Sequence, residues 1–343
     1  MVACRLVLNP EARRPKPSIS AGALLPSESL VSAARSLRER YPDLTVPRLL
    51  DGPNGAIVLD ETGQLTGSFK VRGAIAKLEA LKKSGVTQVV AASAGNHGAG
   101  VAFAAALLGV RATVFVPNTA PMVKCQKIAG AAGVTLRSSH AADYDGAERE
   151  AKFFAESNGL PFVSPYDDPA IVAGNGMSLG FDLAELLRAR FGGVVPDDLC
   201  VLAPVGGGGL AVGLACALPE ARVYGVQSEA SAALALSFER GKAVLELPAT
   251  SHTWAEGLEG GIAENAYRRA RATLAGVFVA SELAILEALR YAHKTLGVPA
   301  EGSAAVSLCP LLTGALQALR AKPALVVSVL TGRNIDPVKV ETL

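Results

Sequence analysis

The sequence carries almost no net charge and no long apolar run. Its 33 lysine and arginine residues face 31 aspartate and glutamate residues. The few basic pairs are scattered, without the interleaved aromatic residues of a nucleic-acid-binding surface. The most apolar stretches are short and rich in alanine and glycine, which is too little to cross a membrane. We therefore expect a cytoplasmic protein with neither nucleic acid nor a membrane as a partner.

The cysteines form no recognisable pair. There are five of them, an odd number, and their spacing shows neither a C-x-x-C motif nor a histidine at the distance typical of zinc ligands. We expect buried, reduced thiols and no metal site. With 35 glycines and 20 prolines, the chain is also interrupted far too often for a coiled coil or a helical bundle.

Short β-branched runs alternate with alanine-rich stretches from about residue 56 onward. This alternation is typical of parallel βαβ units, in which helices cover both faces of a sheet. The predicted class is therefore α/β, with open, twisted, mostly parallel sheets. The expected strands are 56–60, 87–91, 111–116, 133–136, 199–203, 222–227, 276–279 and 324–330.

A chain of 343 residues exceeds one typical core, so two domains are expected. Residues 86–165 contain a strand–helix succession of their own, which Pro161 and Pro165 close. We predict that 86–165 is a small inserted α/β domain and that 1–85 and 166–343 together form a large one. The first fifty residues contain six prolines, and we expect them to wrap the surface or cover a sheet edge.

The first candidate site is Thr66-Gly67-Ser68-Phe69-Lys70, which follows the expected strand 56–60. A lysine at the mouth of a strand–loop–helix unit lies where α/β proteins bind ligands, at the carboxyl ends of the strands. A desolvated amine is neutral part of the time, so it can attack an aldehyde or accept a proton. The alternative is a solvated lysine at the start of a helix.

A second loop, Ser93-Ala94-Gly95-Asn96-His97-Gly98, joins strand 87–91 to a helix expected to begin near Asn96. Its backbone N–H groups and the positive end of the helix would favour a carboxylate, and its small side chains allow close approach. The alternative is an ordinary capped loop in which His97 is a hydrogen-bonded structural residue.

Four consecutive glycines, Gly206, Gly207, Gly208 and Gly209, lie between strand 199–203 and a helix expected over 211–218. Such a loop exposes only backbone N–H groups, and with a helix N-terminus behind it the loop forms a phosphate cradle. The sequence lacks the Lys-Ser/Thr ending of a P-loop and the acidic residue that a dinucleotide fold places on the ribose. A nucleotide is therefore disfavoured, and a flexible turn is the alternative.

The last expected strand, 324–330, ends in Thr331-Gly332-Arg333-Asn334. By itself Thr331 would be a helix-capping residue. However, its hydroxyl lies where the end of a strand meets the presumed cleft. This segment is also the fourth in the chain that follows a strand and could bind a ligand. The pattern therefore favours a site to which all four segments contribute.

In this order the four segments resemble the fold type II (tryptophan synthase β-like) pyridoxal-phosphate enzymes, most closely their threonine/serine dehydratases. The resemblance covers roughly residues 55–336 and implies pyridoxal 5'-phosphate as the cofactor, bound by the large domain. The cofactor-binding residues that it implies are Phe69, Lys70, Asn96, Gly206, Gly207, Gly208, Gly209, Leu210 and Thr331. The substrate carboxylate would be bound by Ser93, Ala94, Gly95, Asn96 and His97.

The resemblance also implies a role for each of these groups. Lys70 forms a Schiff base with the cofactor and takes up the Cα proton, Asn96 bonds the phenolic oxygen, and the glycine loop binds the phosphate. Thr331 meets the pyridine nitrogen with a neutral hydroxyl, which suits β-elimination better than transamination. The implied reaction removes water from a threonine- or serine-like amino acid and yields a 2-oxo acid and ammonia. Relatives are commonly dimers, so a homodimer is expected.

Several residues refine this pattern or depart from it. Ala94 replaces the serine with which racemases of the family reprotonate their substrate, so racemisation is disfavoured. Glu301-Gly302-Ser303 resembles the Glu-Pro-Ser of dehydratases, with the proline replaced. Gln227 replaces a metal-binding glutamate of many relatives, which puts a divalent-cation site in doubt, although Glu229 and Glu256 could still contribute to one. Asn175 replaces a glutamine.

Arg333 takes the place of a glycine or alanine beside the ring-nitrogen contact. It is either a solvated side chain or a contact for the second carboxylate of an acidic substrate such as 3-hydroxyaspartate. Two alternatives to an ammonia-lyase stay open. One is a threonine synthase-like β- or γ-replacement enzyme, and the other is a protein that binds the cofactor without catalysis.

Overall fold

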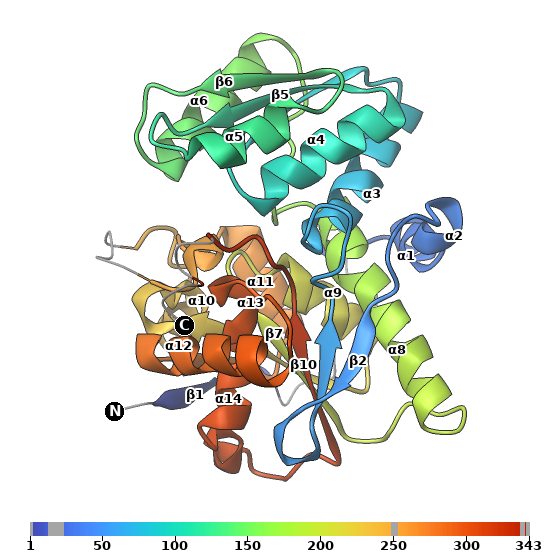
Figure 1. The fold of residues 1–343 in the computed structure, drawn as a ribbon, viewed down its shortest axis with the longest axis vertical. Helices are drawn as coiled ribbons and strands as arrows, with labels where there is room; N and C mark the ends of the chain where they lie inside the picture. The colour runs from blue at the N-terminus through green and yellow to red at the C-terminus, as the bar shows by residue number, and fades with distance from the viewer. Residues whose placement is uncertain (1–2, 13–23, 248–252, 337–339, 341–343) are drawn as a thin grey trace.

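The computed structural model describes residues 3–12, 24–247, 253–336 and 340. These residues form one sheet of seven strands and one of three, with helices packed against both (Figure 1), which confirms the predicted α/β class. The strands are β1 Cys4–Leu8, β2 Arg48–Asp51, β3 Ile57–Asp60, β4 Gln88–Ala92, β5 Arg111–Val116, β6 Val134–Ser138, β7 Leu199–Pro204, β8 Arg222–Ser228, β9 Gly276–Ala280 and β10 Leu325–Leu330.

The seven-stranded sheet has the order β1-β9-β8-β7-β10-β3-β2. Its five inner strands, from β9 to β3, run parallel, whereas β1 and β2 pair antiparallel at the two edges. The carboxyl ends of β7, β10 and β3 therefore lie side by side at one end of the sheet. This is the end at which open α/β sheets bind their ligands.

The hydrophobic pattern predicts all eight strands from β3 to β10, with ends that differ from the structure by at most two residues. It does not predict β1 or β2, which belong to the proline-rich N-terminal segment. That segment supplies both edges of the large sheet instead of covering one of them. An edge strand bonds to only one neighbour and can stay half-exposed, so its sequence shows little of the apolar run that marks an inner strand.

Helices cover both faces of the large sheet. Alternate residues of β7 point to opposite faces of the sheet. Val201 and Ala203 pack with helices α8 to α11 on one face, whereas Cys200 and Leu202 pack with α12 to α14 on the other. The bounds are α8 Ser178–Arg190, α9 Gly209–Ala217, α10 Ala233–Arg240, α11 Glu264–Thr273, α12 Glu282–Arg290, α13 Gly302–Ala305 and α14 Cys309–Leu312.

The three-stranded sheet pairs β4, β5 and β6 in parallel. Helices α3, α4 and α5 share a core with one of its faces, and α6 packs on the other. The helices are α3 Lys70–Lys83, α4 Asn96–Leu108, α5 Met122–Ala129 and α6 Tyr144–Ser157. Figure 1 shows this sheet as a separate layer beyond α3, which runs between the two halves of the molecule.

Helix α3 bears on how the chain divides. It precedes residue 86, yet it contributes Val71, Ile75 and Leu78 to the core of the three-stranded sheet. The division into 1–85 with 166–343 and an inserted 86–165 stays a prediction.

Three further α-helices complete the set among the described residues. They are α1 Glu28–Arg35, α2 Leu37–Arg40 and α7 Pro169–Val172, and α7 continues through the π-helical turn Ala173–Met177 into α8. In the part of the chain that the structure describes, no helix is both long enough and apolar enough to cross a membrane.

Candidate active site

The lysine segment and the threonine segment are hydrogen-bonded to each other at the carboxyl ends of β3 and β10. The backbone N–H of Phe69 donates to the carbonyl of Thr331 over 3.0 Å, and the N–H of Arg333 donates to the carbonyl of Gly67 over 2.9 Å. The side chain of Thr331 is buried. The structure thus brings together two segments that are more than 260 residues apart in the sequence.

Lys70 is the first residue of α3 and is half-buried. Its Nζ donates to the carbonyl of Pro165 over 3.0 Å and lies 5.2 Å from the centre of the Phe69 ring. Desolvation lowers the pKa of Lys70 from 10.5 to about 8, against an opposing effect of the nearby Glu301 carboxylate. Near neutral pH a fraction of this amine is therefore uncharged, as a nucleophile or a proton acceptor requires.

Asn96, at the start of α4, is hydrogen-bonded on both sides of its amide. Its Nδ2 donates to Glu301 Oε1 over 2.6 Å, and its Oδ1 accepts from Asn334 Nδ2 over 2.6 Å. Asn334 follows Thr331, and Glu301 precedes α13, so both partners belong to the large-sheet side. Asn96 therefore connects the loop after β4 to the lysine and threonine segments.

Glu301 is a residue of this site for which the sequence indicates no role. Desolvation raises the pKa of its carboxyl to about 7, and the hydrogen bond from Asn96 opposes that shift. A Cβ on Gly332 would lie 2.5 Å from Glu301 Oε1, so the glycine leaves the room that this carboxyl occupies. A Cβ on Gly302 would lie 1.9 Å from the carbonyl oxygen of Trp254. Position 302 therefore has no room for a side chain, including the proline of the resembling segment.

Packing or backbone conformation disfavours side chains along the glycine loop. A Cβ on Gly207 would lie 2.0 Å from Cγ of the Tyr166 ring, and a Cβ on Gly206 would lie 3.2 Å from Cα of Leu258. Gly208 has a φ of +82°, in the left-handed region that favours glycine. Helix α9 begins at Gly209, and its first N–H groups have no partner within the helix. The loop therefore fits a phosphate, which would be bound by backbone N–H groups from Gly206 to Leu210.

We expect Gly207→Ala to weaken the binding of pyridoxal phosphate at least about tenfold, because the new methyl group must displace Tyr166 or the loop. Titration of the apoprotein with the cofactor, followed by absorbance, measures this loss. Gly63→Ala is the control, because its Cβ would meet only Thr45 Cγ2 at 3.8 Å. Equal affinities of the two variants would contradict the assignment of the loop.

The loop after β4 holds its shape through short local contacts. Ser93 Oγ accepts from the N–H of Gly95 over 3.0 Å, and a Cβ on Gly98 would lie 2.2 Å from the carbonyl oxygen of Ser93. His97 is buried, and its Nε2 lies 2.9 Å from the carbonyl oxygen of Val163. Burial lowers the pKa of His97 to about 3, so its ring is neutral. These contacts favour a structural role for the His97 side chain and leave the backbone of the loop to bind an anion.

Gln227 and Asn175, two of the residues that depart from the family pattern, have structural partners, whereas Arg333 is solvated. Gln227 Nε2 donates to the carbonyl of Val205 over 3.2 Å, and its Oε1 accepts from the N–H groups that open α10. Asn175 Oδ1 accepts from the N–H of Gly73 over 2.8 Å, in the first turn of α3. The side chain of Arg333 is exposed. Among the residues described, no three His, Cys, Asp or Glu side chains form a group that could hold a metal ion.

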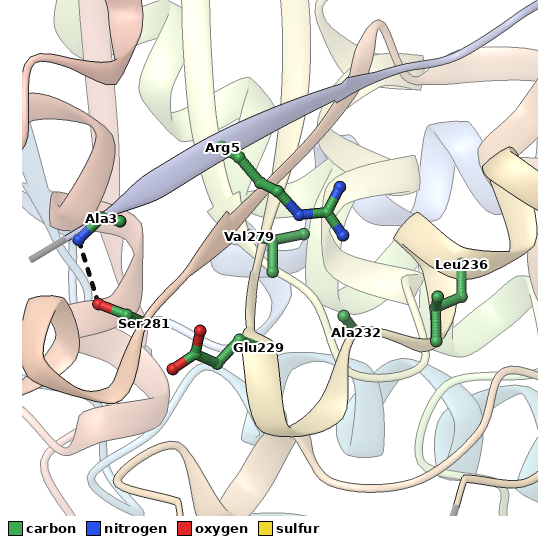
Figure 2. A pocket seen from close by; sticks show the side chains of 7 residues that line it. All are labelled: Ala3, Arg5, Glu229, Ala232, Leu236, Val279 and Ser281. Carbon is green, nitrogen blue, oxygen red and sulfur yellow. Dashed lines mark hydrogen bonds between the residues drawn. The ribbon is translucent and has the colours of Figure 1, made fainter. Parts of the chain in front are cut away.

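A surface hollow lies elsewhere, at the outer edge formed by β1 and β9 (Figure 2). Its charged side chains already have partners, because Arg5 forms an ion pair with Glu239 over 2.8 Å and Glu229 accepts a hydrogen bond from the backbone N–H of Glu282 over 3.3 Å. None of the residues around Lys70 lines it. The hollow is therefore not the candidate active site.

Comparison with known proteins identifies the family of this chain. The family model described as "Pyridoxal-phosphate dependent enzyme" matches residues 37–332. The catabolic L-threonine dehydratase of Escherichia coli (strain K12) is 33% identical over 324 residues, which cover 90% of this chain and 93% of that protein. The crystal structure of the threonine deaminase of T.th. has a TM-score of 0.77 and 34% identity, with 91% of this chain and 99% of that chain covered. The structure of maize serine racemase has a TM-score of 0.81 and 25% identity, with 92% and 95% covered. The chain therefore belongs to the pyridoxal-phosphate-dependent enzymes and is a lyase that uses pyridoxal 5'-phosphate.

Proposed function

We propose that this lyase is an ammonia-lyase that removes water from serine, threonine or a similar β-hydroxy amino acid and releases a 2-oxo acid and ammonia. One observation carries the proposal. The half-buried amine of Lys70 lies at the same end of the sheet as a side-chain-free glycine loop, the buried hydroxyl of Thr331 and the amide of Asn96. The L-threonine dehydratase of E. coli, similar over 90% of this chain, supports the choice of reaction.

Lys70 has the central role in this proposal. When bound, pyridoxal phosphate supplies the electron sink that makes the Cα proton of an amino acid acidic. Lys70 Nζ takes up that proton, because it is an amine whose pKa of about 8 leaves it partly neutral. Loss of this proton and of the β-hydroxyl amounts to loss of water. Hydrolysis of the remaining C–N bond then gives ammonia and the 2-oxo acid.

The loop Ser93–His97 orients the substrate in this proposal. It runs into the first turn of α4, where unpaired N–H groups and the helix dipole favour a carboxylate. Ala94 offers no hydroxyl there that could return a proton to Cα from the opposite face. Elimination is therefore favoured over racemisation, although the fold resembles that of maize serine racemase.

Arg333 bears on which amino acid is bound. Its side chain is exposed, and its backbone N–H is bonded to Gly67. We therefore place the uncharged side chains of serine and threonine ahead of 3-hydroxyaspartate. We also infer a cytoplasmic homodimer, as expected from the composition and from the resemblance.

The test is turnover by the purified holoenzyme with serine, threonine and 3-hydroxyaspartate. We expect ammonia and a 2-oxo acid in equal amounts, with serine or threonine as the best substrate. Absence of product from all three would overturn the proposal. Turnover only with phosphohomoserine or with an added nucleophile would indicate a replacement enzyme. A cofactor spectrum that no amino acid changes would indicate a binding protein without catalysis.

A further inference from the structure

The amide of Asn96 is part of a hydrogen-bond chain that runs in one direction. The chain begins at the backbone carbonyl of Thr66, which accepts from Asn334 Nδ2 over 2.9 Å. The same Nδ2 donates its other hydrogen to Asn96 Oδ1 over 2.6 Å, and Asn96 Nδ2 donates to Glu301 Oε1 over 2.6 Å. Both ends of the chain are therefore acceptors, and the two amides lie between them.

The backbone carbonyl of Thr66, where the series of hydrogen bonds begins, fixes the direction in which all of them are donated. A carbonyl oxygen can only accept, so Thr66 requires that Asn334 present its NH₂ group on that side. Asn334 then has no acceptor to offer Asn96, so Asn96 must present Oδ1 to Asn334 and its NH₂ group to Glu301. The reversed amide would place two NH₂ groups together at Asn334, and two acceptors together at Glu301 when that carboxyl is ionised. Asn96 is left with one N–H that neither neighbour uses.

Two glycines make room for the outer members of the chain. A Cβ on Gly67 would lie 2.7 Å from Asn334 Oδ1, and a Cβ on Gly332 would lie 2.5 Å from Glu301 Oε1. Gly67 also has a φ of +75°. Gly67 belongs to the segment that contains Lys70, and Gly332 belongs to the segment that contains Thr331. The two segments thus leave room for the side chains of Asn334 and Glu301, which form hydrogen bonds with Thr66 and Asn96.

We propose that Glu301 and Asn334 are positioning residues that hold Asn96 in one orientation, with its remaining N–H available to the phenolic oxygen of pyridoxal phosphate. The inference rests on the role expected for Asn96. Because the carbonyl of Thr66 sets the direction, an acceptor at position 334 cannot substitute for the amide, whereas position 301 needs only an oxygen that accepts. The two positions therefore differ in what they tolerate.

The test compares conservative replacements at the two positions in the holoprotein and the apoprotein, without any amino acid. Asn334→Asp has nearly the same shape but turns the donor into an acceptor. We expect it to weaken cofactor binding about tenfold or more, the usual effect of losing an oriented hydrogen bond beside a charge. Glu301→Ala should weaken binding severalfold, whereas Glu301→Gln keeps an accepting oxygen and should stay near the wild-type affinity. Asn158→Asp is the matched control, because the side-chain amide of Asn158 makes an exposed bond to the carbonyl of Phe154 in α6, away from the site.

A second readout separates positioning from a general loss of stability. A hydrogen bond donated to the phenolic oxygen stabilises its ionised form. Asn334→Asp and Glu301→Ala should therefore raise the pH at which the visible band of the bound cofactor titrates, and Glu301→Gln and Asn158→Asp should not. The inference is overturned if Asn334→Asp keeps the wild-type affinity and titration, or if Glu301→Gln is as impaired as Glu301→Ala. Neither readout needs a substrate. If the holoenzyme binds the cofactor but releases no ammonia from serine, threonine or 3-hydroxyaspartate, the proposed function is overturned and this inference still stands.

Discussion

Replacement of Lys70 by alanine will lower the rate of ammonia release from the best hydroxy amino acid by at least about 10³-fold, the scale of a lost general base. The variant loses the amine that lies beside Phe69 and Pro165. Borohydride reduction should fix the cofactor covalently to the wild-type chain at Lys70 and not to the variant, as intact-mass measurement will show. Lys83→Ala is the control on the same helix, because its ion pair with Glu79 is exposed.

The same lysine predicts how the apoprotein responds to pH. The pKa of Lys70 is about 8 in the folded chain and 10.5 ordinarily, so between these values the folded state binds fewer protons than the unfolded state. The apoprotein should therefore gain stability as the pH rises through this window. Capture of pyridoxal phosphate should accelerate as the pH rises through the folded pKa of about 8 and level off above it, because only the neutral amine attacks the aldehyde. Full capture by Lys70→Ala, or capture that does not change with pH, would contradict the assignment.

Arg72→Met will lower the free energy of unfolding by about 3–5 kcal/mol, the usual result of removing one partner from a buried ion pair. The guanidinium of Arg72 is fully buried. Its Nε lies 2.5 Å from Glu61 Oε1, and its Nη1 lies 2.8 Å from Asp182 Oδ2. Methionine fills a similar volume but leaves the Glu61 carboxylate buried without a cation. Denaturant unfolding, monitored by circular dichroism, measures the change.

Two further variants make this measurement specific. Arg5→Met removes an exposed ion pair with Glu239 and should cost at most about 1 kcal/mol. Asp182 keeps its 2.7 Å contact with Arg38 when Arg72 is replaced. Of the two carboxylates that contact Arg72, only Glu61 then lacks a cation. The double variant Arg72→Met/Glu61→Leu should therefore regain much of the lost stability. A loss no larger than that of Arg5→Met would show that the buried network is not stabilising.

The strands were predictable because each inner strand is buried on both faces and therefore reads as an apolar run, as β7 does in Leu199–Pro204. The position of Lys70, Gly206 and Thr331 at one end of the sheet followed from the same pattern, because parallel strands share their carboxyl ends. The two edge strands were not predictable. β1 and β2 are short and half-exposed, and their pairing depends on β9 and β3, which are distant in the sequence.

The contacts that complete the site depend on tertiary structure alone. Asn96 is 238 residues from Asn334 and 205 residues from Glu301. No helix or strand periodicity links residues so far apart, so a single sequence does not reveal these contacts. Tyr166 packs over Gly207 because β7 and the loop after Pro165 meet in space, and no local pattern marks that ring. Glu301 stood in a segment that resembles dehydratases, which was the one available signal for it.

The place of β10 has a consequence for how the protein is made. It is the last strand of the described chain to be synthesised, yet it lies in the middle of the large sheet, between β7 and β3. Until it inserts, β3 and β7 have no common neighbour, so the ends that carry Lys70 and the glycine loop are not held together. Pairings between such distant segments form slowly. A nascent or truncated chain without β10 thus has no assembled cofactor site, and the unpaired edges of β3 and β7 stay open to aggregation.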